Sequence, residues 1–177
     1  MGYREHSREG CVAAAEQGAG VIECDVTFTQ DLALVCRHSQ CDLATTTNIL
    51  QTPLAAKCSK PFRPANGHYP ASATCCTTDI SLAEFKTLCA RPDQSNKKAK
   101  TVAQYLAPLR SPVVSEPLVC GTLMTHAQSI ELIDALGRKF TPELKRPIVD
   151  MPFAPGFTQA AYADILLAEY RAAGIDP

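Results

Sequence analysis

Apolar and polar residues alternate with a strand period in two neighbouring stretches of the chain. Residues 19–29 and 32–37 are rich in apolar and β-branched side chains, and Gln30-Asp31 between them is a typical turn. The pattern predicts two strands joined as a hairpin. Because successive side chains of a strand point to opposite faces, Glu23 and Asp25 are expected to share one face.

The residues on either side of this hairpin carry helix signals. Ser7 is a predicted N-cap, and the helix after it ends at Gly18 and Gly20. Two capping boxes open later helices, Ser81 to Glu84 and Thr125 to Gln128. Further helical segments are predicted at 101–106 and 158–173, and a strand at 138–145 in which Pro142 is expected to mark a strand end. The alternating order of helices and strands predicts an α/β fold.

Residues from about 39 to 78 show no helical period and contain four prolines, which predicts a long irregular insertion. The chain has nine cysteines, six of them between Cys36 and Cys89. Such density suits disulfides that staple the loop in an oxidising compartment, and the odd number leaves at least one thiol without a partner in the chain. A zinc site is the alternative, but the sequence contains no CxxC pair.

Composition excludes several classes of function. The chain has 177 residues, 17 basic and 18 acidic side chains and 46% apolar content, enough for one sizeable core. Near-neutral charge argues against a nucleic-acid partner. No apolar run reaches the length of about 20 residues that spans a bilayer, and no signal segment follows Met1. With the cysteines, this predicts a secreted or periplasmic parent protein whose N-terminal signal the chain lacks.

The two carboxylates on one strand face are the first candidate for chemistry. Glu23 and Asp25 repel each other unless a cation lies between them, and Mg²⁺ or Ca²⁺ prefers oxygen ligands. The alternative is a solvated polar face. Glu143 and Lys145 form a similar pair, suited to a metal and a phosphate or else only to an exposed ion pair. The hairpin would bring His38 close to the carboxylates, where it could transfer protons.

Several motifs together resemble those of the glycerophosphodiester phosphodiesterase family, in its secreted branch with a cysteine-containing insertion. The similar segments are Tyr3-Arg-Glu-His-Ser7 (PENT-type), Gln17-Gly-Ala-Gly20 ("GAD"), Ile22-Glu-Cys-Asp-Val26 ("IExDV"), Thr29-Gln-Asp31 with Leu34-Val-Cys-Arg-His38 ("TKDG…LVxxHD"), Asp42 to Thr47, Thr122 to His126 and Thr141 to Lys145. The resemblance covers nearly the whole chain.

The resemblance implies a TIM (β/α)₈ barrel of the PLC-like phosphodiesterase type, here a single partial domain over residues 1–177. Glu23, Asp25 and Glu143 would hold one divalent cation, Mg²⁺ or Ca²⁺. His38 would be one of two catalytic histidines, and Lys145 would contact the phosphate. The implied reaction is hydrolysis of a small-molecule glycerophosphodiester to an alcohol and glycerol 3-phosphate.

The chain also departs from the family pattern. The family's first catalytic histidine lies in an HRG motif that would precede the present sequence, and His6 is not expected to replace it. Ser39 stands where the family has an aspartate after the second histidine. A complete barrel takes about 250 residues, so we expect roughly the first half of a barrel, with weak or no activity alone.

Two other functions remain open from the sequence. One is a phospholipase D of the sphingomyelinase type, which shares the two-histidine and metal arrangement. The other is a non-catalytic secreted binding module built on the cysteine-rich region. The sequence leaves the cysteine pairing, the identity of the metal and the oligomeric state undecided.

Overall fold

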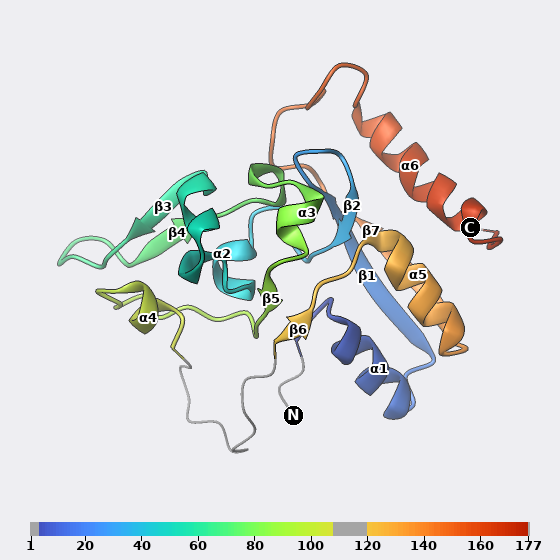
Figure 1. Cartoon of the computed structure of the whole chain (residues 1–177), viewed down its shortest axis with the longest axis horizontal. Helices are drawn as coiled ribbons and strands as arrows, with labels where there is room; N and C mark the ends of the chain where they lie inside the picture. Colours follow the sequence, from blue (N-terminus) through green and yellow to red (C-terminus); the bar gives the residue numbers. More distant parts are fainter. Residues whose placement is uncertain (1–3, 108–119, 177) are drawn as a thin grey trace.

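A computed structural model of the chain describes residues 4–107 and 120–176 (Figure 1). Met1, Tyr3 and Pro177 lie outside the described residues. The helices are α1 (Arg8–Glu16), α2 (Leu43–Thr46), α3 (Leu82–Phe85), α4 (Val102–Tyr105), α5 (His126–Ala135) and α6 (Gln159–Ala172), with 3-10 turns η1 (Ile49–Gln51), η2 (Pro53–Lys57) and η3 (Thr77–Asp79). The strands are β1 (Val21–Phe28), β2 (Leu34–Cys36), β3 (Lys60–Arg63), β4 (Ser72–Thr74), β5 (Cys89–Ala90), β6 (Gly121–Thr122) and β7 (Lys139–Leu144).

The central sheet has three strands in the order β2-β1-β7. Strands β1 and β2 pair antiparallel, which confirms the predicted hairpin. Strands β1 and β7 pair parallel, and α5 lies in the crossover between them. This helix packs against all three strands (Figure 1). Within the described residues the strands do not close into a barrel, so the fold is an open α/β arrangement.

The predicted helix caps are present at the ends of the long helices. The Ser7 side chain accepts a hydrogen bond from the Gly10 N–H, and α1 begins directly after it. Thr125 and Gln128 form the predicted capping box of α5, and the Thr158 side chain caps α6. Because these bonds satisfy N–H groups that the helix cannot pair internally, the starts of the helices are readable from local sequence.

Two buried clusters lie beside the central sheet. The first joins β1 and β2 to α6, where the Phe28 ring contacts Phe157 and Tyr162 at centroid distances of 4.8 and 5.0 Å. The second joins α1 and α5 to β1 and includes Ile22 and Ile133. Together they cover the face of β1 that carries its even-numbered residues, which leaves the odd-numbered Glu23 and Asp25 facing the other way.

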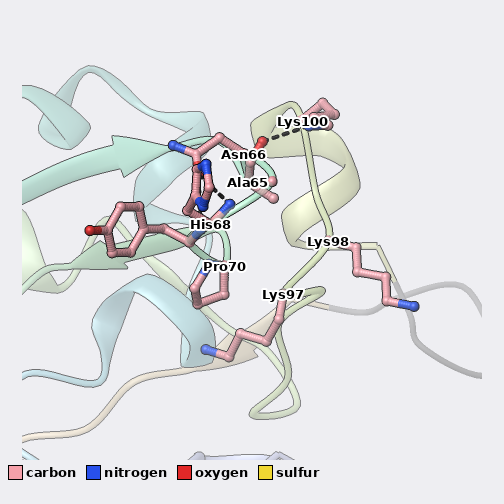
Figure 2. Close-up of a pocket in the computed structure, with 9 residues that line it drawn as sticks. Ala65, Asn66, His68, Pro70, Lys97, Lys98 and Lys100 are labelled. Atoms are coloured by element: carbon pink, nitrogen blue, oxygen red, sulfur yellow. Dashed lines mark hydrogen bonds between the residues drawn. The ribbon is translucent and has the colours of Figure 1, made fainter.

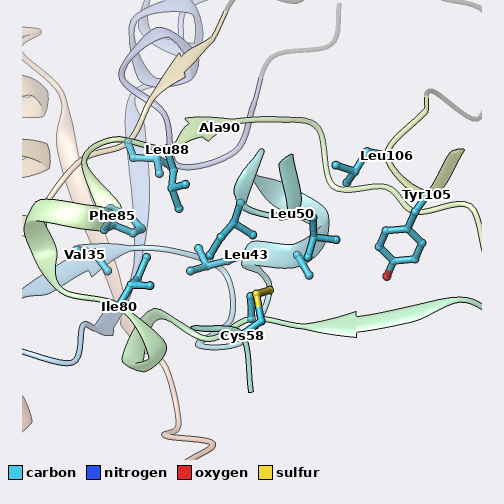
Figure 3. Packing of buried hydrophobic residues seen from close by; sticks show 14 of the residues in the cluster. Val35, Leu43, Leu50, Cys58, Ile80, Phe85, Leu88, Ala90, Tyr105 and Leu106 are labelled. Atoms are coloured by element: carbon cyan, nitrogen blue, oxygen red, sulfur yellow. A yellow bond between two sulfur atoms is a disulfide. The ribbon is translucent and has the colours of Figure 1, made fainter. Parts of the chain in front are cut away.

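The segment predicted as an irregular insertion contains more structure than the sequence suggests. Residues 39–78 form α2, the three 3-10 turns and the antiparallel ribbon β3–β4. With the residues that follow, they enclose the third buried cluster, which includes Leu43, Ile49, Phe85 and Tyr105 (Figure 3). We call residues 43–107 the insertion lobe. Its elements are too short to produce a recognisable period, since most of them span three to five residues.

Three of four disulfides help to hold these short elements together, and the fourth joins β1 to β2. The pairs are Cys24–Cys36, Cys41–Cys76, Cys58–Cys75 and Cys89–Cys120. Cys11 is a free, buried thiol, as the odd number of cysteines requires. The predicted stapling is thus confirmed, and the zinc alternative is not, because eight of the nine cysteines are consumed in disulfides.

Pro142 does not mark a strand end as predicted. It lies within β7, opposite Cys24 of β1. In the described part of the chain β7 pairs with β1 alone, so it is an edge strand. An edge strand tolerates a residue without an N–H group, because one side of its backbone has no strand to bond.

The cap of α5 gives a first testable prediction. Thr125→Ala removes the acceptor for the Gln128 N–H and should lower the free energy of unfolding by about 1 kcal/mol in urea titrations. Glu131→Ala, at an exposed position of the same helix, is the control and should change it by less than about 0.5 kcal/mol. Equal losses for both variants would contradict a capping role.

Candidate metal centre

Three carboxylates converge on one face of the central sheet. Asp25 of β1 and Glu143 of β7 are direct partners in the parallel register, and Glu23 precedes Asp25 by two residues on the same strand. One oxygen from each of the three lies within 4.8 Å of the others. Asp25 is buried, whereas Glu23 and Glu143 are exposed. Strand alternation and strand pairing therefore bring together the three acids that the sequence singled out.

The two oxygens of Asp25 have different surroundings. His6 Nε2 lies 3.0 Å from Oδ2, and Lys145 Nζ lies 4.0 Å from the same atom. The other oxygen, Oδ1, is buried and has no hydrogen-bond partner in the described part of the chain. A buried carboxylate oxygen without a partner is costly, and a bound cation would satisfy it.

The charge balance at Asp25 is unfavourable without such a cation. Burial raises the pKa of Asp25, Lys145 opposes this shift, and the neighbouring acids Glu23 and Glu143 raise it further, to about 6. Asp25 is thus a carboxyl group whose charged form the fold disfavours. A divalent ion would reverse this balance, because it adds the opposite charge where three carboxylates meet.

The donor spacing suits a hard divalent cation. Ca²⁺ holds oxygen ligands at about 2.3 to 2.6 Å, so ligands on opposite sides of the ion lie about 5 Å apart. Mg²⁺ holds them at about 2.0 to 2.1 Å and needs a tighter set. The three carboxylate oxygens lie within 4.8 Å of one another, close enough for all three acids to bind one such ion.

Lys145 is positioned beside the acids by β7. Its Nζ lies 2.9 Å from Glu143 Oε1, so the residues two apart on the strand do share a face. The hydrogen bond to Glu143 raises the pKa of Lys145, and burial opposes that rise only in part. Lys145 is therefore a protonated ammonium group at neutral pH, next to a cluster of carboxylate oxygens and partly open to solvent.

His38 follows β2 at the end of the hairpin, and its side chain is exposed. The preceding residue, Arg37, is buried, and its N–H donates to the Asp25 carbonyl at 2.8 Å. This bond fixes the backbone before His38 next to Asp25. His38 is close enough to contribute to the lowering of the Glu143 pKa, although the Lys145 hydrogen bond is the main cause.

His6 is the residue at this site to which sequence analysis gave no role. Its ring is almost fully buried against Asp25, and burial, followed by the charge of Arg37, lowers its pKa to about 3. Nε2 of this neutral ring lies 3.0 Å from Asp25 Oδ2. His6 adopts φ = 52°, a left-handed conformation that is costly outside glycine. His6 lies within the PENT-type motif, but only the tertiary contact with Asp25 shows what its side chain does.

Arg37 holds the segment that carries His6. Its guanidinium Nη2 donates to the Glu5 carbonyl at 3.3 Å, and Nε lies 3.9 Å from Asp42 Oδ1. The first interaction ties the backbone next to His6 to the end of the hairpin, and the second links Arg37 to the residue that precedes α2. Arg37 is thus a buried structural support behind the acidic cluster, and it explains why this cation follows the apolar strand so closely.

The open α/β fold with a carboxylate cluster on its parallel strands defines the class: a partial barrel with a candidate divalent-metal site. A family model described as "Glycerophosphoryl diester phosphodiesterase family" matches residues 1–151, and the chain belongs to this family. The resemblance stated from the motifs is therefore confirmed.

One curated relative and two solved structures are similar to parts of this chain. An "Extracellular protein" of Arthroderma benhamiae is 42% identical over 88 residues, which cover 48% of this chain and 35% of the relative. A solved structure, a putative glycerophosphoryl diester phosphodiesterase from Silicibacter pomeroyi, has a TM-score of 0.56 at 16% identity and covers 95% of this chain and 50% of that chain. A second, from Parabacteroides distasonis, has a TM-score of 0.49 at 16% identity, covering 97% of this chain and 40% of that chain. The chain thus spans half or less of the length of each.

The likeness to the first solved structure supports a partial TIM-barrel-like fold, as predicted. Within residues 4–107 and 120–176, no helix is both long enough and apolar enough to cross a membrane.

Proposed function

We propose that Glu23, Asp25 and Glu143 bind one divalent cation, Mg²⁺ or Ca²⁺, and that this centre serves the hydrolysis of glycerophosphodiesters to an alcohol and glycerol 3-phosphate. The observation that carries the proposal is the unpartnered, buried Oδ1 of Asp25 within a cluster of three carboxylates. Family membership supports the substrate class. When bound, the cation would act as a Lewis acid toward the phosphoryl oxygen.

The remaining residues have roles that their positions support. Lys145, a protonated ammonium group beside Glu143, would bind the negative phosphate of the substrate. His38 is exposed next to the cluster and would transfer protons to or from the reacting oxygens. His6, whose Nε2 lies 3.0 Å from Asp25 Oδ2, would hold this carboxylate in one orientation, as partners behind metal ligands commonly do.

Two further properties belong to the same proposal. The family match over residues 1–151 supports one partial phosphodiesterase domain over residues 1–177, with an insertion from about 39 to 78. Four disulfides and an extracellular relative support a secreted parent protein.

Hydrolysis of glycerophosphocholine tests the function directly. We expect slow release of glycerol 3-phosphate that requires Mg²⁺ or Ca²⁺ and stops with EDTA. Glu143→Gln should lower the rate at least about tenfold, because it removes a charged ligand. Sphingomyelin, offered under the same conditions, should not be hydrolysed faster. Turnover that is indifferent to EDTA would contradict the metal centre.

The pH dependence of cation binding tests the centre without turnover. Asp25 must lose its proton to bind a cation, and its pKa is raised to about 6, first by burial. We therefore expect the affinity for Ca²⁺ to be constant above pH 7 and to fall about tenfold per pH unit below 6. Titration calorimetry in two buffers of different ionisation enthalpy should show that calcium binding releases a proton at pH 5.5 but not above pH 7. Affinity independent of pH between 5 and 7 would contradict Asp25 as a ligand.

A further inference from the structure

The insertion lobe carries a charge opposite to that of the rest of the chain. Residues 43–107 hold eight of the 17 Lys and Arg residues but three of the 18 Asp and Glu residues, a formal charge of +5 in a chain of net charge −1. No acid occurs between residues 43 and 78 or between 94 and 107. Lys57 is neutralised by Glu84 at 2.5 Å, whereas no other lysine or arginine of the lobe makes an ion pair within the described residues.

Three of the cations without an ion pair, Lys97, Lys98 and Lys100, line an open groove at the end of the lobe. The loop between β3 and β4 lies beside residues 97–100, and backbone hydrogen bonds from Ala65 to Ala99 and from Ala71 to Lys97, each 2.8 Å long, join the two segments. Between them is a groove of about 480 Å³. Figure 2 shows its lining, with His68 on the loop and the three lysines on the facing segment. In Figure 1 the β3–β4 ribbon lies at the opposite end of the molecule from α5 and α6.

The three lysines do not converge on one point. Lys100 Nζ donates to the Ala65 carbonyl at 2.6 Å, and Lys97 Nζ lies 5.9 Å from the centre of the Tyr105 ring. The ammonium groups of Lys97 and Lys98 point in opposite directions along the rim (Figure 2). Such a spread does not enclose a single phosphate group. It presents a broad positive surface, which is complementary to a plane of negative charges.

Tyr69 adds an apolar contribution to this surface. It lies in the loop between β3 and β4 and is 70% exposed, the largest exposure among the large hydrophobic residues described. A tyrosine has an apolar ring and a polar hydroxyl, which suits the boundary between water and lipid headgroups. The loop is firmly held, because Asn66 Oδ1 accepts from the N–H of Tyr69 at 2.8 Å and the Cys58–Cys75 disulfide closes the base of the ribbon.

We propose that this surface, residues 66–70 and 97–100, docks the protein on membranes rich in anionic phospholipids. The lysines neutralise the headgroups, and Tyr69 inserts at their level. A nucleic acid or another soluble polyanion would match the charge alone, whereas the exposed aromatic ring at the tip of a rigid loop favours a lipid surface. The proposal concerns binding and is independent of the hydrolysis proposed for the acidic cluster.

Vesicle sedimentation tests the proposal with the disulfide-bonded chain. We expect binding to phosphatidylcholine vesicles that contain about one-third phosphatidylserine, weakening at high salt, and no binding to phosphatidylcholine alone. Lys97→Ser with Lys98→Ser should reduce binding about 25-fold, since each lysine contributes roughly a factor of five near an anionic surface. Lys97→Arg with Lys98→Arg should restore it. Tyr69→Ser should reduce it about fivefold, because the ring no longer partitions into the interface.

The matched control removes two charges elsewhere. Lys139→Ser with Arg171→Ser, both exposed outside the lobe, should change vesicle binding less than about twofold. Lys98→Ser alone replaces the double variant if thermal unfolding shows the latter to be unstable. Equal binding to neutral vesicles, or equal loss in the control, would overturn the proposal. So would unchanged vesicle binding by Tyr69→Ser together with tighter binding to heparin or a DNA duplex, which would identify a general polyanion site.

Discussion

Asp25→Asn is expected to stabilise the metal-free protein and at the same time to abolish its metal binding. The fold disfavours the charged form of Asp25, whose pKa is raised to about 6, with burial the largest cause. Asparagine has nearly the same shape and carries no charge. At pH 7.5 in EDTA we therefore expect the free energy of unfolding to rise by about 2 to 3 kcal/mol.

The sign of this effect depends on pH. A carboxyl group with a raised pKa stabilises the fold while it is protonated, and that contribution is lost as pH rises from about 4 through 6. The difference in the free energy of unfolding between Asp25→Asn and the wild type should therefore grow over this pH range and vanish below pH 4. Calcium affinity should fall at least about a hundredfold, more than the loss caused by residues that only support ligands.

A control separates this result from a general loss of charge. Asp134→Asn removes an exposed acid of α5 and should alter neither calcium affinity nor the pH dependence of urea unfolding. If Asp25→Asn instead destabilised the metal-free protein, the carboxylate would be a structural hydrogen-bond acceptor. A variant that is more stable without metal and binds calcium less tightly would show that the Asp25 carboxylate serves metal binding rather than folding.

Two of the three acids in the cluster were predictable from a local rule, and the third was placed with them by the family resemblance. Glu23 and Asp25 share a face by strand alternation, and Glu143 joins them through parallel pairing of β7 with β1. The helix caps at Ser7 and Thr125 were readable for the same reason, since the capping residue lies within a few positions of the N–H that it satisfies. The family resemblance of the motifs, rather than hydrophobic periodicity, predicted that Glu143 lies close to Glu23 and Asp25.

Two features could not be predicted from the sequence. His6 reaches Asp25 only because Arg37, far along the chain, holds the backbone of the preceding residue. The insertion lobe builds a core from elements of two to five residues, too short for any period. In both cases tertiary contacts, not local preference, determine the conformation.

The lobe should therefore depend on its disulfides more than on its hydrogen bonds. Cys41→Ser with Cys76→Ser opens a crosslink between residues 35 positions apart. The entropy of closing a loop of that length gives an expected loss of about 3 to 4 kcal/mol in the free energy of unfolding. Both cysteines lie at the point where the lobe joins the central sheet, so we expect the lobe to unfold at lower urea concentration than α5 and α6.

Hydrogen exchange measured by mass spectrometry on the same variant would distinguish local from global loss. Protection should fall in residues 43–107 and remain in β1, β7 and α5, whose contacts lie in other buried clusters. Cys11→Ser is the control, because Cys11 is a free thiol and forms no disulfide. This variant should leave hydrogen exchange in the lobe unaltered. Uniform deprotection of sheet and lobe would mean that the two form one cooperative unit. In that case the disulfide would stabilise the metal centre as well as the lobe, and calcium affinity would fall in parallel with stability.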